Sequence, residues 1–151
     1  MIITNEQQLR LPCEPVKPEE IDELRAELEK ELNEINKYRS GIGLAAPQIG
    51  IQKSMAIVRL TYGPTVYKLD LVNPIISKGY DSMISRNEGC LSIPNMYVDV
   101  VRYNEIYVIN NLVKPYSFIA TGALAVVCQH EIDHLNSKLI IDYQNKENKH
   151  E

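Results

Sequence analysis

The sequence has no long apolar run and no excess of basic residues. No stretch approaches the roughly 20 apolar residues that a membrane-spanning helix needs. The start, from Met1 to Arg10, is too polar for a secretory signal. Sixteen basic and 20 acidic side chains give a formal net charge of -4, so there is no positive field to draw the chain onto nucleic acid or anionic lipid. We therefore expect a cytoplasmic protein with no membrane contact and no direct nucleic-acid site.

Cysteine and histidine are also scarce, and their positions indicate where to look for chemistry. The three cysteines are Cys13, Cys90 and Cys128. An odd number of widely separated cysteines is a poor basis for a disulfide framework, so at least one is a candidate ligand or reactive thiol. Of the three histidines, His130 and His134 lie four residues apart, whereas His150 lies in a polar C-terminal segment.

The hydrophobic pattern predicts one α+β domain. A chain of 151 residues with 44% apolar content is large enough to build one core. Apolar residues at three- and four-residue steps predict an amphipathic helix from Pro18 to about Tyr38, and the Ala/Leu/Val-rich segment Gly122 to Asn136 predicts a buried second helix. Short β-rich stretches predict antiparallel strands at Met55–Leu60, Val66–Val72, Tyr97–Val101 and Glu105–Ile109. The expected fold has antiparallel β-sheets packed around a central helix, plus the N-terminal amphipathic helix.

Two segments fall outside this pattern. Residues Gly41 to Gly50 contain three glycines and a proline, which argues against a regular helix or a central strand and predicts a shaped loop. The last eight residues, 144–151, are too polar to bury. We expect a single catalytic domain over residues 1–143 and a disordered tail over residues 144–151.

The predicted second helix carries the pattern His-Glu-x-x-His. A spacing of four places the imidazoles of His130 and His134 on one face, where both can bind the same metal ion. Glu131 then lies beside the metal as a candidate general base. Two ordinary helix histidines are the alternative, but with histidine so scarce the motif rarely arises by chance.

A catalytic metal of this type takes three protein ligands and keeps one position for water, so the helix is one ligand short. In the metzincin motif a third histidine follows six residues after the second, but the residue six positions after His134 is Ile140. The acids that follow the motif are Asp142, Glu147 and Glu151. Asp142 fits a strand or cap position better than a ligand position, and the other two acids belong to the polar tail.

Cys90 is the better candidate, although a lone cysteine is usually a small buried hydrophobe. Its neighbour Gly89 lets the backbone bend close to another group. Cys128 lies two residues before His130, about 200° around the helix from it, and so points away from the ligand face. Cys13 has no neighbours of a metal-binding kind.

Three segments together resemble the signatures of peptide deformylases. They are the loop Gly41–Gln48, the turn Glu88–Ser92 and the helical segment Gln129–Leu135. They occur in the order of that family and at similar separations. The helix motif alone is shared with many metalloproteases, whereas the combination is specific. The resemblance extends through Ile140–Tyr143, which is similar to the closing strand of the family.

The resemblance implies hydrolysis of the formyl group from the N-terminal formyl-methionine of nascent polypeptides, with release of formate. It implies a ferrous ion, replaceable by Zn²⁺, Ni²⁺ or Co²⁺, with one water and three protein ligands. These ligands are Cys90, His130 and His134. Metal binding lowers the pKa of water toward about 7, and Glu131 would act as the general base. The side-chain amide of Gln48 and the backbone N–H of Leu91 would stabilise the charge that develops on the carbonyl oxygen.

The resemblance also implies a way of binding substrate. The backbone at Gly43 and Gly89 would pair with the extended peptide as an added strand. The apolar residues expected to receive the methionine side chain are Ile42, Val126 and Val127, for which plain core packing is an equal alternative. The implied partners are nascent formyl-methionyl chains at the ribosome exit. We expect a monomer in the cytoplasm of a bacterial cell or a phage-infected host.

The chain departs from the family pattern at two places. Tyr97 stands where many bacterial members have an arginine near the substrate backbone, which leaves peptide contacts beyond methionine open. The sequence stops eight residues after Tyr143, where many members continue into a long helix; short forms are familiar among organelle-derived and phage-encoded relatives.

Two other functions fit the helix motif. The first is a metallopeptidase that cuts internal amide bonds with a different third ligand. The second is a deformylase-like binding protein that has lost catalysis, which would be expected to lack a ligand, Gln48 or Glu131. All of these residues are present.

Overall fold

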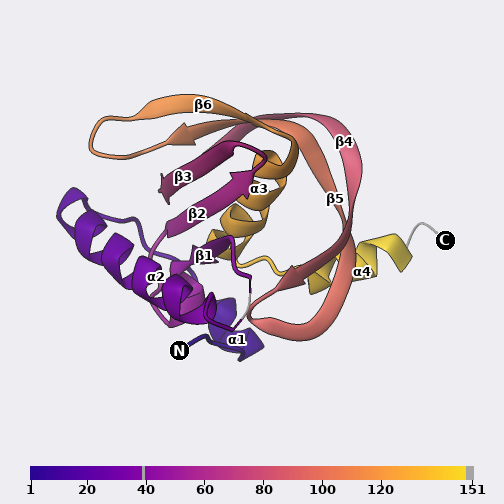
Figure 1. Ribbon diagram of the computed structural model, residues 1–151, viewed down its shortest axis with the longest axis horizontal. Helices are drawn as coiled ribbons and strands as arrows, with labels where there is room; N and C mark the ends of the chain where they lie inside the picture. The colour runs from indigo at the N-terminus through magenta and orange to yellow at the C-terminus, as the bar shows by residue number, and fades with distance from the viewer. Residues whose placement is uncertain (39, 149–151) are drawn as a thin grey trace.

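The computed structural model, which describes residues 1–38 and 40–148, consists of two antiparallel sheets packed against one helix (Figure 1). The first sheet has the order β1-β2-β3 and contains β1 (Gly43–Ala45), β2 (Met55–Tyr62) and β3 (Thr65–Val72). The second has the order β4-β5-β6 and contains β4 (Ile75–Cys90), β5 (Ile93–Asn110) and β6 (Tyr116–Thr121). The expected α+β architecture is confirmed.

The central helix is α3 (Gly122–Leu135), which packs against both sheets. Its inward residues Ala125, Cys128 and Ile132 share one core cluster with Val58 of β2 and Ile106 of β5. Full burial of an aliphatic side chain stabilises the fold by about 1.5–3 kcal/mol, so this cluster holds the helix firmly between the sheets. The metal-motif histidines are therefore placed on a helix that is firmly packed in the core.

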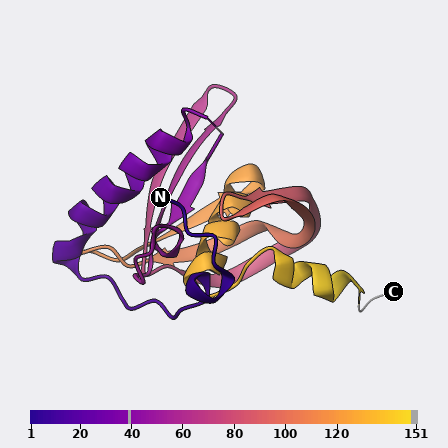
Figure 2. The same ribbon diagram turned by 90° about the horizontal axis from the view of Figure 1, so that it is seen from below.

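The amphipathic helix α2 (Ile21–Ile35) covers the other face of the first sheet (Figure 2). It follows a short 3₁₀ turn, η1 (Pro18–Glu20), and buries Leu24, Leu28 and Leu32 against the sheet. Strand β2 is thus buried on both faces: Met55 and Ile57 pack with α2, while its alternate residues pack with α3. None of the helices within the described residues has the length and apolar character of a membrane span.

Strand prediction succeeded where β-rich, apolar residues form a short continuous stretch and failed elsewhere. Strands β2 and β3 extend the predicted ones by one or two residues. The stretches Tyr97–Val101 and Glu105–Ile109 belong to the single strand β5, because the polar residue Arg102 between them continues the inward-facing alternation and is buried. Strands β4 and β6 were not predicted, since most of their side chains remain at least partly exposed and carry no clear apolar pattern.

The loop expected at Gly41–Gly50 contains two short elements. Gly43–Ala45 forms the edge strand β1, which pairs only with β2 in the described sheets. Residues Ala46–Ile49 form the 3₁₀ turn η2, which ends at Gly50 with a φ of 83°. The glycines therefore shape this segment, and it contains no regular α-helix or central strand, as expected. It is not a loop throughout, because the three residues of β1 are buried and extend the first sheet as an edge strand.

The segment after α3 was expected to be a closing strand, and this prediction is wrong. It forms the helix α4 (Ile141–Asn148). The Asp142 carboxylate accepts a hydrogen bond from the Leu139 backbone N–H at 3.1 Å, as a residue at a helix start does, and pairs with Arg10 at 2.6 Å. The tail expected to be disordered over residues 144–151 begins inside this helix. Residues 149–151, including His150, lie outside the described residues, and the domain boundary at residue 143 stays a prediction.

A short N-terminal helix, α1 (Glu6–Leu9), completes the fold. The Asn5 side chain accepts a hydrogen bond from the Gln8 backbone N–H and so caps the helix. Arg10, the residue after α1, reaches across to Asp142 and to the Ser137 carbonyl oxygen. These contacts join the two ends of the described chain beneath the site.

Candidate metal centre

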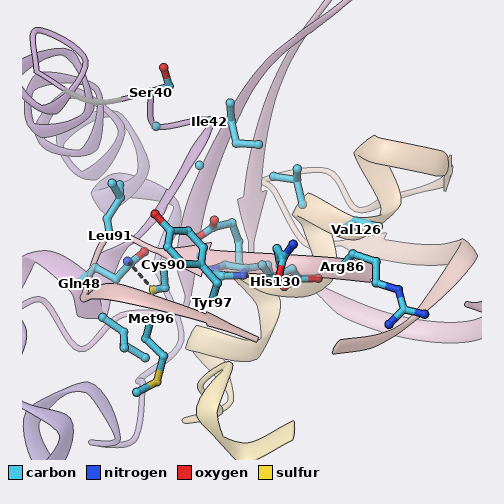
Figure 3. Close-up of a pocket in the computed structure, with 18 of the residues that line it drawn as sticks. Ser40, Ile42, Gln48, Arg86, Cys90, Leu91, Met96, Tyr97, Val126 and His130 are labelled. Atoms are coloured by element: carbon cyan, nitrogen blue, oxygen red, sulfur yellow. Dashed lines mark hydrogen bonds and ion pairs between the residues drawn. The ribbon is translucent and has the colours of Figure 1, made fainter. Parts of the chain in front are cut away.

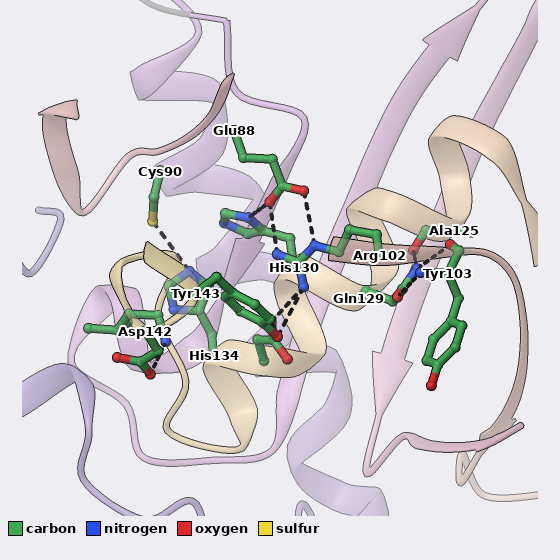
Figure 4. Close-up of polar contacts among 12 residues, drawn as sticks. Glu88, Cys90, Arg102, Tyr103, Ala125, Gln129, His130, His134, Asp142 and Tyr143 are labelled. Atoms are coloured by element: carbon green, nitrogen blue, oxygen red, sulfur yellow. Dashed lines mark hydrogen bonds and ion pairs between the residues drawn. The ribbon is translucent and has the colours of Figure 1, made fainter. Parts of the chain in front are cut away.

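One helix and one strand end supply the three predicted metal ligands. His130 and His134 lie on the same face of α3, and Cys90 is the last residue of β4 (Figure 4). The potential ligand atoms of the three residues all lie within 4.8 Å of one another. The sulfur of Cys90 is 3.4 Å from Nε2 of His134. The tertiary structure therefore brings together residues that are 40 or more positions apart in the chain.

These distances fit a tetrahedral metal site. Bonds of about 2.3 Å to sulfur and about 2.1 Å to nitrogen place two ligands about 3.6 Å apart at a tetrahedral angle. One thiolate and two imidazoles form a donor set that suits zinc, iron, nickel and cobalt. Burial lowers the pKa of His134 well below its usual value, which keeps this imidazole neutral and able to donate a lone pair. The residues present thus fit a divalent transition metal.

A buried carboxylate orients the other histidine. Nδ1 of His130 lies 3.2 Å from Oε1 of Glu88, which leaves Nε2 to face the other ligands. Burial lowers the pKa of His130, but contacts with Cys90 and Glu88 outweigh it and raise the pKa to about 10. A metal ion at Nε2 competes with this proton, because both take the same lone pair.

Glu88 belongs to a buried ionic network. The guanidinium of Arg102 donates two hydrogen bonds to Glu88, at 2.9 and 2.8 Å, and a third to Asp133 at 2.6 Å. The hydroxyl of Tyr143 in α4 donates to the same Asp133 oxygen at 2.6 Å. Burial raises the pKa of Glu88, yet the Arg102 hydrogen bonds outweigh it and lower the pKa to about 2. The network links β4, β5, α3 and α4 behind His130.

We expect Arg102→Met to lower the free energy of unfolding by about 3–5 kcal/mol, because it leaves the buried carboxylate of Glu88 and the partly buried one of Asp133 without their cation. The matched control is Arg86→Met, which removes an exposed ion pair with Asp99 and should cost far less, because exposed ion pairs contribute little to stability. Urea denaturation of the metal-free proteins measures both. A loss no larger for Arg102→Met than for Arg86→Met would show that the network is not structural.

The same substitution has a pH signature. The pKa of Glu88 is depressed in the fold, so its contribution to stability is present above about pH 4.5, the ordinary pKa of the group. The contribution is lost as the pH falls toward the folded pKa of about 2. The stability difference between the parent protein and Arg102→Met should therefore shrink on acidification over this range.

Glu131 lies beside the ligands in a tight, buried position. Its side chain is 4% exposed, and its Oε1 atom has no hydrogen-bond partner in the described residues. Burial raises its pKa to about 7. A Cβ atom added to Gly43 would come within 2.5 Å of the Glu131 carboxylate. The glycine in β1 is therefore required for close approach of the acid, a role that sequence reasoning did not assign to it.

Gln48 is fixed with its amide nitrogen toward the ligands. Its Oε1 accepts a hydrogen bond from the Ala45 backbone N–H at 3.0 Å. Its Nε2 lies 3.7 Å from the sulfur of Cys90 and 3.1 Å from Oγ of Ser92. The side chain is 2% exposed, so it is not the surface loop residue that its position in a glycine-rich segment would suggest. A donor held here can face an oxygen bound next to Cys90.

A cleft of about 490 Å³ opens over these residues (Figure 3). It is lined by all but one of the predicted site residues: Ile42, Gly43, Gln48, Gly89, Cys90, Leu91, Val126, Val127, His130 and Glu131. The exception, His134, is buried beneath it. Val127 also belongs to the hydrophobic core, so the packing explanation applies to it as well as a binding role.

Sequence reasoning missed several members of the site. Arg102 and Tyr143 were given no role, and Glu88 and Ser92 were quoted only as parts of a motif. For Arg102 a signal was present, because it continues the inward alternation of Val98 and Val100 and an arginine there needs buried partners. The other two cysteines lie apart from the ligands: Cys128 is in the core, where burial raises its pKa to about 12, and Cys13 is half-buried.

Comparison with known proteins gives one consistent family. The family model described as polypeptide deformylase matches residues 1–150. A peptide deformylase of Buchnera aphidicola subsp. Cinara cedri is 38% identical over 140 residues, which are 91% of this chain and 92% of the relative. Two further curated relatives are longer, and the chain spans 62% of the length of each.

Solved structures agree in fold. A probable peptide deformylase from Synechococcus phage S-SSM7 has a TM-score of 0.83 and 34% identity, with 95% of this chain and 98% of that chain covered. A Met-Ala-Ser-bound class I type b peptide deformylase from Acinetobacter baumannii has a TM-score of 0.82 and 27% identity, with 95% and 96% covered.

Proposed function

The chain belongs to the peptide deformylase family of metal-binding hydrolases, and we propose that it removes the formyl group from formyl-methionyl polypeptides with release of formate. The observation that carries this proposal is the third ligand. Cys90 meets His130 and His134, whereas a metallopeptidase of the same helix motif would need another donor. Asp142, one of the acids considered for that place, is paired with Arg10 instead.

In the proposed reaction Cys90, His130 and His134 hold a divalent metal ion. A divalent metal held there would lower the pKa of water toward about 7 and so would supply a nucleophile at neutral pH. Glu131 accepts the proton of that water and returns it to the departing amine. A raised pKa suits both steps, because the carboxylate must gain and lose a proton near neutral pH.

Gln48 and Leu91 are the proposed donors for the formyl oxygen. The Gln48 amide nitrogen already faces Cys90, and its orientation is set before substrate arrives by the hydrogen bond from Ala45. A donor that needs no reorganisation stabilises developing charge most effectively. The Leu91 backbone follows Cys90 directly and lines the same cleft.

The peptide is proposed to bind as an added strand between the two sheets. Among the described strands, β1 and β4 each have one edge without a partner, and both lie at the cleft through Gly43 and Gly89. Free backbone groups on such edges can pair with an extended peptide. The methionine side chain would then occupy the apolar part of the cleft, formed by Ile42, Val126 and Val127.

We infer further that ferrous iron is the native metal, with zinc, nickel and cobalt as substitutes, since the thiolate and imidazole donors accept each of them. Because formyl-methionine begins newly made chains, the proposed place of action is the ribosome exit in the cytoplasm of a bacterium or a phage-infected host. The protein is proposed to act as a monomer, because one chain supplies all three ligands and the general base.

The test is formate release from formyl-Met-Ala-Ser by anaerobically prepared, iron-loaded protein. We expect turnover that a chelator abolishes and that iron or nickel restores. Mass spectrometry of the products separates the alternatives, because a metallopeptidase would cut an internal amide bond. A binding protein without catalysis would hold the peptide and release nothing, and either result would contradict the proposed function.

A further inference from the structure

Tyr97 forms an exposed aromatic wall at the mouth of the cleft. Its side chain is 68% exposed, and it lines the cleft together with Met96 (Figure 3). The ring lies against the backbone of Gly89: a Cβ atom added to Gly89 would come within 3.1 Å of Tyr97 Cε1. No side chain therefore separates the ring from the edge of β4 at this point.

The register of β4 and β5 defines the face on which the ring lies. In β5 the residues Val98, Val100 and Arg102 point inward and are buried, whereas Tyr97 points outward with its alternate neighbours. The inward face contacts α3, through Arg102 and Asp133 for example. Tyr97 thus lies on the face of the second sheet away from α3. A side chain at Gly89 would point to the same face, toward the Tyr97 ring.

This placement selects one residue of a bound peptide. Residues paired in a β-ladder place their side chains on the same face, and successive side chains alternate. A peptide that turns its methionine toward Val126 and Val127 of α3 turns the following residue the other way. That residue then lies beside Tyr97.

The charges near the ring are already compensated. Arg86 donates a hydrogen bond to Asp99 at 2.8 Å, and Asp99 also accepts one from the Asn87 backbone N–H. Among the residues that the structure describes, this ion pair leaves no single charge at the rim to attract an acidic or a basic side chain. The surface offered to the second residue is therefore the aromatic ring of Tyr97.

We propose that Tyr97 is a specificity-determining residue that favours an aromatic or large apolar residue directly after formyl-methionine. The inference rests on the proposed deformylase function. A phenylalanine at this position gains an aromatic contact that alanine cannot make, and such a contact corresponds to about a five-fold preference.

The experiment compares kcat/KM for formyl-Met-Phe-Ser and formyl-Met-Ala-Ser. The parent protein should favour the phenylalanine peptide by about five-fold, Tyr97→Phe should keep the preference and Tyr97→Ala should bring the ratio close to one. The matched control is Tyr67→Ala, which removes an exposed tyrosine of β3 that does not line the cleft. Calorimetry of Met-Phe-Ser and Met-Ala-Ser with zinc-loaded protein provides a second readout that needs no turnover.

The outcomes separate the two hypotheses. A ratio near one in the parent protein, a ratio that survives Tyr97→Ala, or an equal loss in Tyr67→Ala overturns the role of Tyr97. If no peptide yields formate but the calorimetric preference is present and disappears in Tyr97→Ala, the proposed function is wrong and the role of Tyr97 in peptide selection stands.

Discussion

Glu131→Gln is expected to lower formate release by about 10²–10⁴-fold while the protein still binds one equivalent of metal. Glutamine has the size of glutamate but cannot accept a proton, and Glu131 is not among the three ligands. Because Glu131 is buried with a raised pKa, loss of its charge should not destabilise the fold.

Three measurements on the same preparation check this result: kcat for formyl-Met-Ala-Ser, metal content and the midpoint of thermal unfolding. Glu34→Gln, which breaks the exposed ion pair between Glu34 of α2 and Lys37, controls for the substitution itself. Turnover near the parent value in Glu131→Gln would remove this residue from the mechanism. Loss of metal together with activity would make it a ligand instead of a base.

Cys90→Ala should abolish tight metal binding and, with it, activity. Loss of a group that only orients a ligand lowers affinity by about 10–100-fold, and loss of a ligand should exceed that. The two histidines would remain on α3, but a pair of imidazoles leaves the site without its anionic donor. Competition with a chromophoric chelator measures the change in affinity.

Two controls isolate the thiolate. Cys13→Ala removes a half-buried cysteine far from the ligands and should keep the parent affinity. The cobalt-substituted parent should show an absorbance band from thiolate-to-metal charge transfer, which Cys90→Ala lacks and Cys13→Ala keeps. Unchanged affinity for one equivalent of metal in Cys90→Ala would refute the ligand assignment.

The elements that could be predicted are those whose pattern is local. The amphipathic spacing of α2 and the apolar content of α3 follow from neighbours within a few turns, and both helices are found close to the predicted bounds. The β-rich composition of β2 and β3 is equally local. The short segment after α3 is ambiguous by this criterion, because an apolar run followed by an acid suits a strand or a helix start. The helix makes contacts with Arg10, which is distant in sequence, and with Asp133 of α3, and a local pattern records neither.

The residues of the site also fall into two groups, those placed by local spacing in the sequence and those placed by the tertiary structure. The sequence by itself determined that His130 and His134 share one face and that Glu131 lies beside them, because a helix repeats every 3.6 residues. Cys90 was favoured by its local motif, but only the tertiary structure decided that its sulfur meets the histidines. Only the tertiary structure, too, placed Arg102 between Glu88 and Asp133, set Gly43 against Glu131 and put the ring of Tyr97 over Gly89. These contacts join different strands and helices, and their partners are chosen by the burial of charge and by close packing across the core, which no local period records.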